Sequence, residues 1–181
     1  MNAAPEPRLI RLTRTAHACG WSETCWSERH LASLGLATSF VEDALEHAAA
    51  PLTLRGLHWQ RPPHAQARLL RAVAGRAMAV AIDLRRGAAG FRRHVAHVLD
   101  AKTASAFYVP EGFALGTLTL LPDTLLLTKL SAPSLPSARA GLRWNDPALG
   151  VLWPLAGATP VMEAADRALP RLAEIGEALA A

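Results

Sequence analysis

The amino-acid sequence predicts an all-β domain built as an antiparallel sandwich or barrel. Two observations support this fold class. Short β-type segments follow one another at steps of about ten residues, and Gly, Pro or Asp residues separate them, as at Pro62-Pro63, Gly75 and Pro122-Asp123. The expected strands are residues 52–60, 67–74, 77–85, 91–99, 104–109, 113–121 and 124–130.

The segment 77–84 shows the strand pattern most clearly. Its large side chains, Met78, Val80, Ile82 and Leu84, fall on one face, and Ala77, Ala79, Ala81 and Asp83 fall on the other. The first face is suited to packing bulky groups. The second, with its small side chains, is suited to the wall of a lumen that holds a ligand.

Short helices are expected to flank the strands. Residues 27–35 are expected to form one or two turns, and residues 170–180 a final helix that begins at Pro170, a suitable first helical position. The chain has 181 residues, of which 51% are hydrophobic. We therefore expect one domain over residues 1–181, with a poorly defined N-terminal segment at residues 1–18.

The composition also indicates compartment and partners. The two cysteines, Cys19 and Cys25, are too few for a disulfide framework, and there is no long apolar run or secretory signal. A cytoplasmic protein without membrane contact is expected. The net charge is +4, but the densest basic cluster, Arg85-Arg86 with Arg92-Arg93, contains glycines typical of a hairpin tip. We therefore expect no nucleic-acid partner.

The main candidate for chemistry is His58, in the middle of an expected strand. An imidazole on a rigid element can take and release a proton near neutral pH, so His58 is a candidate general base. The alternative is a structural polar group that is hydrogen-bonded and inert, which is the commoner role of a lone histidine on a strand.

Metal binding is a weaker alternative. A common metal-binding pattern on β-strands has two histidines one residue apart and then a glutamate, but Gln60 occupies the second histidine position. His94 and His97 are three residues apart on an expected strand, so they should point to opposite faces. We expect no metal and no cofactor.

The tryptophans are expected mainly in the core or at an interface. They are Trp21, Trp26, Trp59, Trp144 and Trp153. Trp21 and Trp59 are the better candidates for stacking on a nucleotide base, because they lie within the polar motifs at residues 20–24 and 55–60.

Several motifs, in order along the chain, resemble one enzyme family. They are Gly20-Trp21-Ser22-Glu23-Thr24, Ser39-Phe40-Val41-Glu42-Asp43, Arg55-Gly56-Leu57-His58-Trp59-Gln60, Pro62-Pro63-His64-Ala65-Gln66-Ala67, Ala81-Ile82-Asp83-Leu84-Arg85-Arg86-Gly87, Tyr108-Val109-Pro110-Glu111-Gly112-Phe113-Ala114, Gly141-Leu142-Arg143-Trp144-Asn145-Asp146-Pro147-Ala148-Leu149-Gly150 with Trp153-Pro154, and Asp166-Arg167-Ala168-Leu169-Pro170. From about residue 19 onward the chain is similar to the dTDP-4-dehydrorhamnose 3,5-epimerase family.

The resemblance implies a fold and a chemistry. The implied fold is a cupin-like jelly-roll β-barrel with short flanking helices, usually a homodimer that needs no metal. In that family a histidine removes a proton from a sugar carbon beside a 4-keto group, and an aspartate pairs with the histidine. The motifs carry these roles onto His58 and Asp166. Arg55 would bind the diphosphate with its forked donors.

The departures from the family pattern gather where the family holds its substrate. Thr128 stands in place of the acid tyrosine, and a threonine hydroxyl is a far weaker acid than a phenol. The other departures are Cys19, Glu42, Ala44, Arg68, Ala79, Leu115 and Ser134. The sole tyrosine of the chain, Tyr108, lies in a different motif.

Three hypotheses follow. The leading one is an isomerase acting on a nucleotide-linked 4-keto-6-deoxy sugar, dTDP-linked by resemblance, with altered or restricted epimerisation. The second is a non-catalytic protein that binds a sugar nucleotide or only assembles with partners. The third is a cupin of unrelated function. The expected substrate-binding residues are Arg55, Gln60, Arg68, Glu23, Glu42, Thr128 and Arg143.

Overall fold

The computed structural model describes residues 5–36 and 39–175. The strands are β1 (Arg8–Arg11), β2 (Thr13–His17), β3 (Gly20–Thr24), β4 (Glu42–Ala48), β5 (Leu54–Gln60), β6 (Arg68–Ala74), β7 (Arg76–Asp83), β8 (His94–Asp100), β9 (Ser105–Val109), β10 (Phe113–Thr119), β11 (Thr124–Leu130) and β12 (Arg139–Gly141). The helices are α1 (Glu28–Ser33), α2 (Ala164–Arg167) and α3 (Leu172–Ile175), with 3-10 turns η1 (Pro136–Ala138) and η2 (Pro147–Leu149).

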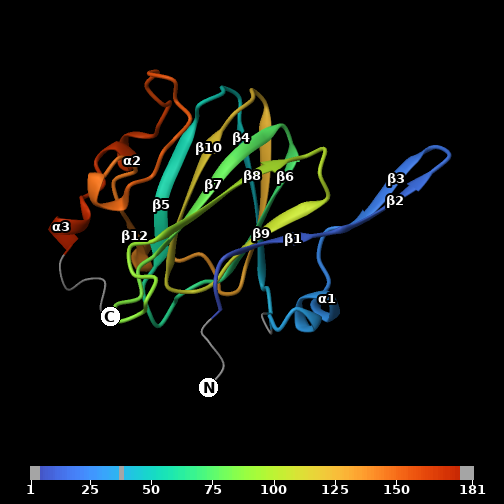
Figure 1. Cartoon of the computed structure of the whole chain (residues 1–181), viewed down its shortest axis with the longest axis horizontal. Helices are drawn as coiled ribbons and strands as arrows, with labels where there is room; N and C mark the ends of the chain where they lie inside the picture. Colours follow the sequence, from blue (N-terminus) through green and yellow to red (C-terminus); the bar gives the residue numbers. More distant parts are fainter. Residues whose placement is uncertain (1–4, 37–38, 176–181) are drawn as a thin grey trace.

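Two antiparallel sheets of five strands face each other (Figure 1). The first has the strand order β1-β9-β6-β11-β4 and the second β12-β5-β10-β7-β8. The β2–β3 hairpin forms a separate small sheet and projects away from the body. The predicted jelly roll is confirmed, but the two sheets do not close into a continuous barrel.

The expected strands from 52–60 to 124–130 all appear, with ends that differ by a few residues. Strands β1 to β4 and β12 were not predicted. Residues 1–18 were expected to be poorly defined, yet β1 pairs with β9 and β2 pairs with β3. Charged and alanine-rich segments such as 42–48 lack β-branched residues, so their strand character comes from pairing partners rather than from local propensity.

The helices agree in part with the prediction. Helix α1 lies inside the expected range 27–35, and the Ser27 side chain caps it by accepting from the backbone N–H of His30. Helix α3 falls within the expected helix 170–180, of which residues 176–180 lie outside the described part of the chain. None of the helices among the described residues is long and apolar enough to cross a membrane.

The inner face of β7 packs against the first sheet and is not open to a ligand. Ala77, Ala79 and Ala81 point between the sheets as predicted, but they contact a cluster that includes Leu99 and Phe107. The small side chains therefore leave room for bulky residues of the facing sheet. The expectation that this strand lines a ligand lumen is wrong.

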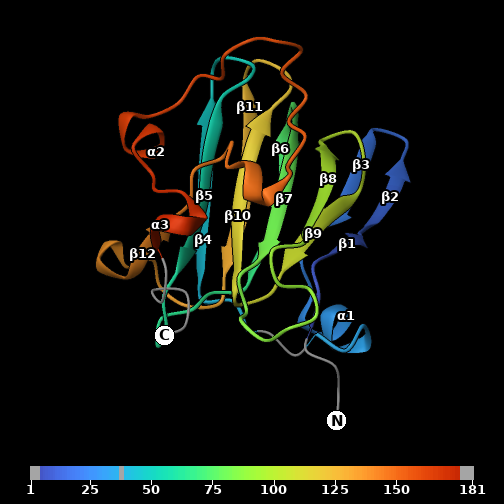
Figure 2. The same cartoon turned by 60° about the vertical axis from the view of Figure 1, so that its left-hand side comes forward.

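The outer face of the second sheet is covered by the C-terminal segment (Figure 2). Val80 and Ile82 pack there against Leu142, Leu149 and Leu172. The motif from Arg143 to Pro154 forms part of this covering segment. Within it the Trp153 indole donates to the Trp144 carbonyl (3.0 Å), which stabilises its conformation. This segment carries α2 to the side of β5, where the site lies.

Candidate active site

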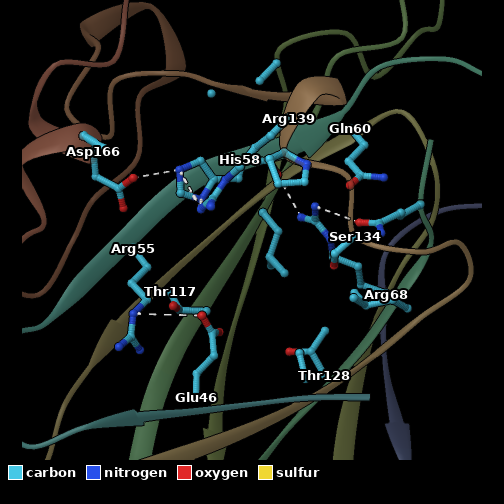
Figure 3. A pocket seen from close by; sticks show the side chains of 18 of the residues that line it. Glu46, Arg55, His58, Gln60, Arg68, Thr117, Thr128, Ser134, Arg139 and Asp166 are labelled. Carbon is cyan, nitrogen blue, oxygen red and sulfur yellow. Dashed lines mark hydrogen bonds and ion pairs between the residues drawn. The ribbon is translucent and has the colours of Figure 1, made fainter. Parts of the chain in front are cut away.

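A cavity of about 910 Å³ lies at the β12–β5 end of the two sheets. Strands β4, β6 and β11 supply one wall, β5, β10 and β12 supply the other, and α2 closes one side. Polar side chains from several of these elements point into it (Figure 3). Packed core therefore fills one half of the space between the sheets, and the other half is open to a ligand.

His58 and Asp166 form an ion pair on the wall of this cavity. The His58 Nε2 atom lies 2.8 Å from Asp166 Oδ1, and the side chains are only 14% and 8% exposed. The two residues are far apart in sequence, on β5 and α2. The pairing that the resemblance implied is therefore present in the structure.

Backbone pairing brings Asp166 to this position. Val161 forms two backbone hydrogen bonds with the start of β5. Its carbonyl accepts from the Leu54 N–H (2.8 Å), and its N–H donates to the Leu52 carbonyl (2.9 Å). The chain then turns into α2. The Gly56 N–H donates to the second carboxylate oxygen of Asp166 (2.9 Å), which fixes the carboxylate in orientation.

Gly56 is required at this point for two reasons. Its φ of +96° is in a region that favours glycine. A Cβ atom there would lie 2.6 Å from the Leu115 carbonyl oxygen on β10. Glycine thus allows β5 to approach β10 closely, and its N–H is available to orient the Asp166 carboxylate.

The local environment keeps Asp166 ionised. Burial alone would raise its pKa, but the hydrogen bonds from His58 and from the Gly56 N–H, together with the charges of His58 and Arg139, hold the pKa below the ordinary 3.8. At neutral pH the dyad therefore contains a carboxylate that accepts a hydrogen from the imidazole.

Three arginines point into the same cavity. Arg55 donates to the His47 carbonyl (2.9 Å) and lies 4.0 Å from the Glu46 carboxylate. Arg68 donates to the His58 carbonyl (2.8 Å), and its pKa is lowered to about 10 by burial and by the charge of Arg139, against an opposing effect of Glu46. The cavity is thus suited to an anionic group.

The third arginine lies directly against the imidazole. Arg139 is on β12, where it pairs in register with Gln60 of β5. Its Nη2 atom is 2.8 Å from His58 Nδ1 and 3.3 Å from His58 Nε2. This contact was not predicted, because Arg139 stands in a loop-like run of Ser, Ala and Pro.

Among the described residues, the wall opposite His58 has no phenol. Thr128 of β11 presents a hydroxyl there and lies across the cavity from His58 in Figure 3, with Glu46 of β4 on the same wall. Thr117, on β10, presents a second hydroxyl from the sheet that carries His58. Leu115 stands opposite His58 in the β10–β5 register. Tyr108 is buried in a different cluster, with Ile10 and Leu31, so no phenol is among the residues that line the cavity.

The predicted substrate-binding residues divide into two groups. Arg55, Gln60, Arg68 and Thr128 line the cavity, whereas Glu23, Glu42 and Arg143 do not. The Gln60 side-chain amide is hydrogen-bonded to the loop at residues 133–135: it donates to the Pro133 carbonyl and accepts from the Leu135 N–H. It therefore shapes the cavity edge more than it offers free donors.

The three residues outside the cavity have structural contacts. Glu23 is ion-paired with Arg14 (2.6 Å) and with Arg71. Glu42 accepts from the Ser134 N–H (3.0 Å), and Arg143 donates to the Leu169 carbonyl (3.2 Å). Each contact has a structural part, so a motif match alone did not separate residues that line the cavity from supporting ones.

Other expected features are also placed. Trp59 packs on the outer face of the second sheet, away from the cavity, and Trp21 is 57% exposed on the projecting hairpin with the Arg14 guanidinium over its ring. His97 packs on Phe107, whereas His94 contacts the Leu149 carbonyl, so the two point to opposite faces as predicted.

Metal-ligating side chains do not cluster in the described part of the chain. No group of three or more His, Cys, Asp or Glu residues is placed to hold a metal ion there. The Asp166 carboxylate contacts the His58 imidazole and the Gly56 backbone N–H instead of facing other potential metal ligands.

Glu46 is a cavity residue that the sequence did not reveal. It lies on β4 two residues after Ala44, which also lines the cavity, so the two share a face of that strand. Recognition of β4 as a strand would have identified it. The charged run Glu42 to Glu46 does not read as a strand by propensity.

Fold and site together define a class: a cupin-like jelly roll with an enclosed histidine–aspartate pair and a cationic cavity. The family model for dTDP-4-dehydrorhamnose 3,5-epimerase matches residues 3–174. The dTDP-4-dehydrorhamnose 3,5-epimerase of Sinorhizobium fredii is 36% identical over 174 residues, covering 94% of this chain and 87% of the relative. This chain belongs to the dTDP-4-dehydrorhamnose 3,5-epimerase family.

Two solved structures are similar throughout. The dTDP-4-dehydrorhamnose 3,5-epimerase of Bacillus anthracis, with TDP and PPi bound, has a TM-score of 0.89 and 31% identity, covering 92% of this chain and 94% of that chain. The dTDP-6-deoxy-D-glucose-3,5-epimerase of Legionella pneumophila, in complex with dTDP-4-keto-L-rhamnose, has a TM-score of 0.90 and 27% identity, covering 98% and 94%.

Proposed function

We propose that the protein is an isomerase that removes a proton from a sugar carbon beside a 4-keto group of a nucleotide-linked sugar. The observation that carries this proposal is the His58–Asp166 pair, 2.8 Å apart, on the wall of a cationic cavity. A dTDP-linked substrate is supported by the similar structures that hold TDP with PPi and dTDP-4-keto-L-rhamnose.

The first chemical step uses the ring nitrogen that Asp166 does not bind. With its hydrogen on Nε2 shared with Asp166, the imidazole has a lone pair on Nδ1 that takes the proton from the sugar carbon. The electron pair of the broken C–H bond forms a carbon–carbon double bond, and the carbonyl pair moves onto oxygen. Asp166 then stabilises the imidazolium that results.

The developing enolate requires positive charge or donors close to its oxygen. Arg68 is suited to this, because it is half-buried and reaches from β6 across to β5, where it donates to the His58 carbonyl (2.8 Å). Arg55, on the same strand as His58, is suited to the diphosphate, because its fork can bind two phosphate oxygens.

Inversion requires a second proton from the opposite face of the sugar. Thr128 faces His58 across the cavity, but its hydroxyl is a much weaker acid than a phenol. We therefore propose that proton exchange outpaces inversion, with water or the imidazolium itself returning the proton. This is the altered or restricted epimerisation that the sequence led us to expect.

A non-catalytic sugar-nucleotide-binding or assembly protein is the second candidate. It is favoured by one observation: Arg139 lies within hydrogen-bonding distance of His58 Nδ1, the nitrogen that catalysis needs. In this alternative the cavity would bind the nucleotide sugar without turnover.

One experiment separates the two. The protein is incubated with dTDP-4-keto-6-deoxyglucose in heavy water, and NMR follows label at C3 and C5 while separate signals report inversion. Label without matching inversion supports the restricted isomerase. Binding of the nucleotide sugar with no label above that of a sample without enzyme supports the non-catalytic alternative.

We also propose a cytoplasmic homodimer. The projecting β2–β3 hairpin carries Trp21, which is 57% exposed, and the edge strand β4 carries Leu45, which is 62% exposed. Apolar groups of this size are commonly covered by a partner. Free Cys19 and Cys25 suit a reducing compartment. Sedimentation should give twice the chain mass at micromolar concentration, and a monomer would contradict the dimer.

A further inference from the structure

His58 is covered at both ring nitrogens. Asp166 Oδ1 is 2.8 Å from Nε2, and Arg139 Nη2 lies 2.8 Å from Nδ1 and 3.3 Å from Nε2. Such similar distances to the two nitrogens place the guanidinium across the ring rather than along one lone pair. In this arrangement the guanidinium occupies space beside Nδ1 that a bound sugar would need.

The contact between Arg139 and His58 is weakly held. Arg139 is exposed on a strand of three residues, and the second arginine, Arg68, faces the same space. The charge of Arg139 is one of the causes that disfavour the charged form of Arg68, so the two cations repel each other. Among the described residues, neither of them forms an ion pair with a carboxylate within 4.0 Å.

We propose that Arg139 is a mobile cover for His58, drawn off the imidazole by an anionic phosphate group of the bound ligand. A guanidinium forms stronger, bidentate bonds with a phosphate than with a neutral ring nitrogen. An anion between Arg139 and Arg68 would also relieve their mutual repulsion. The inference rests on the proposed function for its meaning, because an uncovered base matters only where a base acts.

Arg139 is then a positioning residue that links binding to chemistry. Without an anion the imidazole is shielded, and with an anion Nδ1 becomes free to accept a proton. The nucleotide part of the substrate would thus switch on the base that acts on the sugar part. A simple supporting role for Arg139 makes no such link.

Nitrogen-15 NMR of histidine-labelled protein tests the cover without any need for turnover. Inorganic pyrophosphate is titrated into the wild type, into Arg139→Gln and into Arg61→Gln, an exposed arginine at the end of β5 outside the cavity lining. We expect a saturable shift of the His58 Nδ1 signal in the wild type and in Arg61→Gln. Arg139→Gln should start at the shifted position and change little.

The result that overturns the proposal is equally direct. Calorimetry first measures pyrophosphate binding. If pyrophosphate fails to bind the wild type, or binds while the His58 signals stay fixed, Arg139 is not an anion-drawn cover. The same holds if free Arg139→Gln has the His58 signals of the free wild type. The Arg139→Lys variant keeps the charge but has one donor group, and its His58 signals should resemble those of Arg139→Gln.

A second measurement joins the cover to the proposed reaction. A 4-keto-6-deoxy sugar without phosphate is incubated with the protein in heavy water, with and without pyrophosphate. We expect pyrophosphate to stimulate exchange at least about 10-fold in the wild type and to lose this effect in Arg139→Gln. If the NMR shift appears and no substrate of any kind exchanges, the cover stands and the proposed isomerase fails. Equal stimulation in both proteins overturns the cover.

Discussion

The two sides of the cavity differ in how completely they are equipped for proton transfer. On the side of β5 and α2, His58 is held by a carboxylate whose other oxygen is fixed by the Gly56 N–H. On the opposite wall, Thr128 of β11 offers one aliphatic hydroxyl, and Glu46 of β4 offers a carboxylate that lies 4.0 Å from the Arg55 guanidinium. The base side has a base with its orienting partner, whereas none of the described residues on the opposite wall has a phenol that could serve as the acid.

This difference teaches that the two halves of an epimerisation can be separated physically. Removing a proton needs a base, its orienting partner and positive charge near the oxygen. Adding a proton to the other face needs a positioned acid. A cavity with only the first set predicts exchange without efficient inversion, and each prediction below tests one side of the comparison.

The largest effect is expected from loss of the base. His58→Ala should lower deuterium exchange into the keto sugar by at least about 10²-fold, the low end for a general base. NMR in heavy water measures it, with binding checked separately by calorimetry. His64→Ala is the matched control, because His64 is exposed and outside the cavity lining. Unchanged exchange in His58→Ala removes the base side of the comparison altogether.

The partner of the base should matter for stability as well as for exchange. Asp166→Asn removes a charge-assisted bond to His58, so we expect a loss of about 1.5–3 kcal/mol of unfolding free energy at neutral pH. Because the folded pKa of Asp166 lies below the ordinary 3.8, its stabilisation is present above that value and disappears as pH falls through the folded pKa.

Urea unfolding of both proteins at a series of pH values checks this dependence. The gap between wild type and Asp166→Asn should be constant from neutral to weakly acidic pH and shrink only in strong acid. A gap that disappears while the pH is still above the ordinary value of 3.8 would falsify the assignment of an ionised Asp166.

The support of the dyad can be tested at Gly56. Gly56→Ala meets both an unfavourable φ of +96° and a Cβ contact of 2.6 Å with the Leu115 carbonyl, so we expect a loss of about 1–3 kcal/mol with weaker exchange. Gly157→Ala is a matched control: its φ is +85°, but nothing lies within 4 Å of the added Cβ. Equal losses in thermal unfolding of the two variants would show that the approach of β5 to β10 is unimportant.

Sequence reasoning predicted the central strands and the His58–Asp166 pair, and the reasons differ. The strands from 52–60 to 124–130 have apolar runs and clear turn residues, so local chemistry indicates them. The prediction that His58 pairs with Asp166 rested on the family resemblance. The two residues are far apart in the sequence, and no periodicity relates such distant positions.

The contacts that the sequence did not predict arise from tertiary placement. Arg139 reaches His58 only because the three-residue strand β12 pairs with β5. Glu46 lines the cavity only because its charged segment pairs with β11 and forms strand β4. Arg143 illustrates the reverse case: a motif residue that supports the chain by donating to the Leu169 carbonyl. Motif membership indicates a fold position, whereas a role depends on where the side chain points.

The smallest expected effect is a gain on the acid side. By the family resemblance, Thr128 stands where the family has its acid tyrosine; it is 5% exposed and faces the cavity from β11. Thr128→Tyr supplies a phenol, a far stronger acid than the threonine hydroxyl, within a cavity of about 910 Å³ that has room for the ring. We expect the ratio of inversion to exchange to rise only a few-fold, because Leu115 and Arg68 also depart from the family pattern and weaken substrate positioning. The measurement is NMR of C3 and C5 signals in heavy water, and Thr128→Phe is the control, since it has the ring without the acid. If the wild type already inverts both carbons as fast as it exchanges them, the acid side is not deficient. A donor other than Tyr108, which lies outside the cavity, must then be sought.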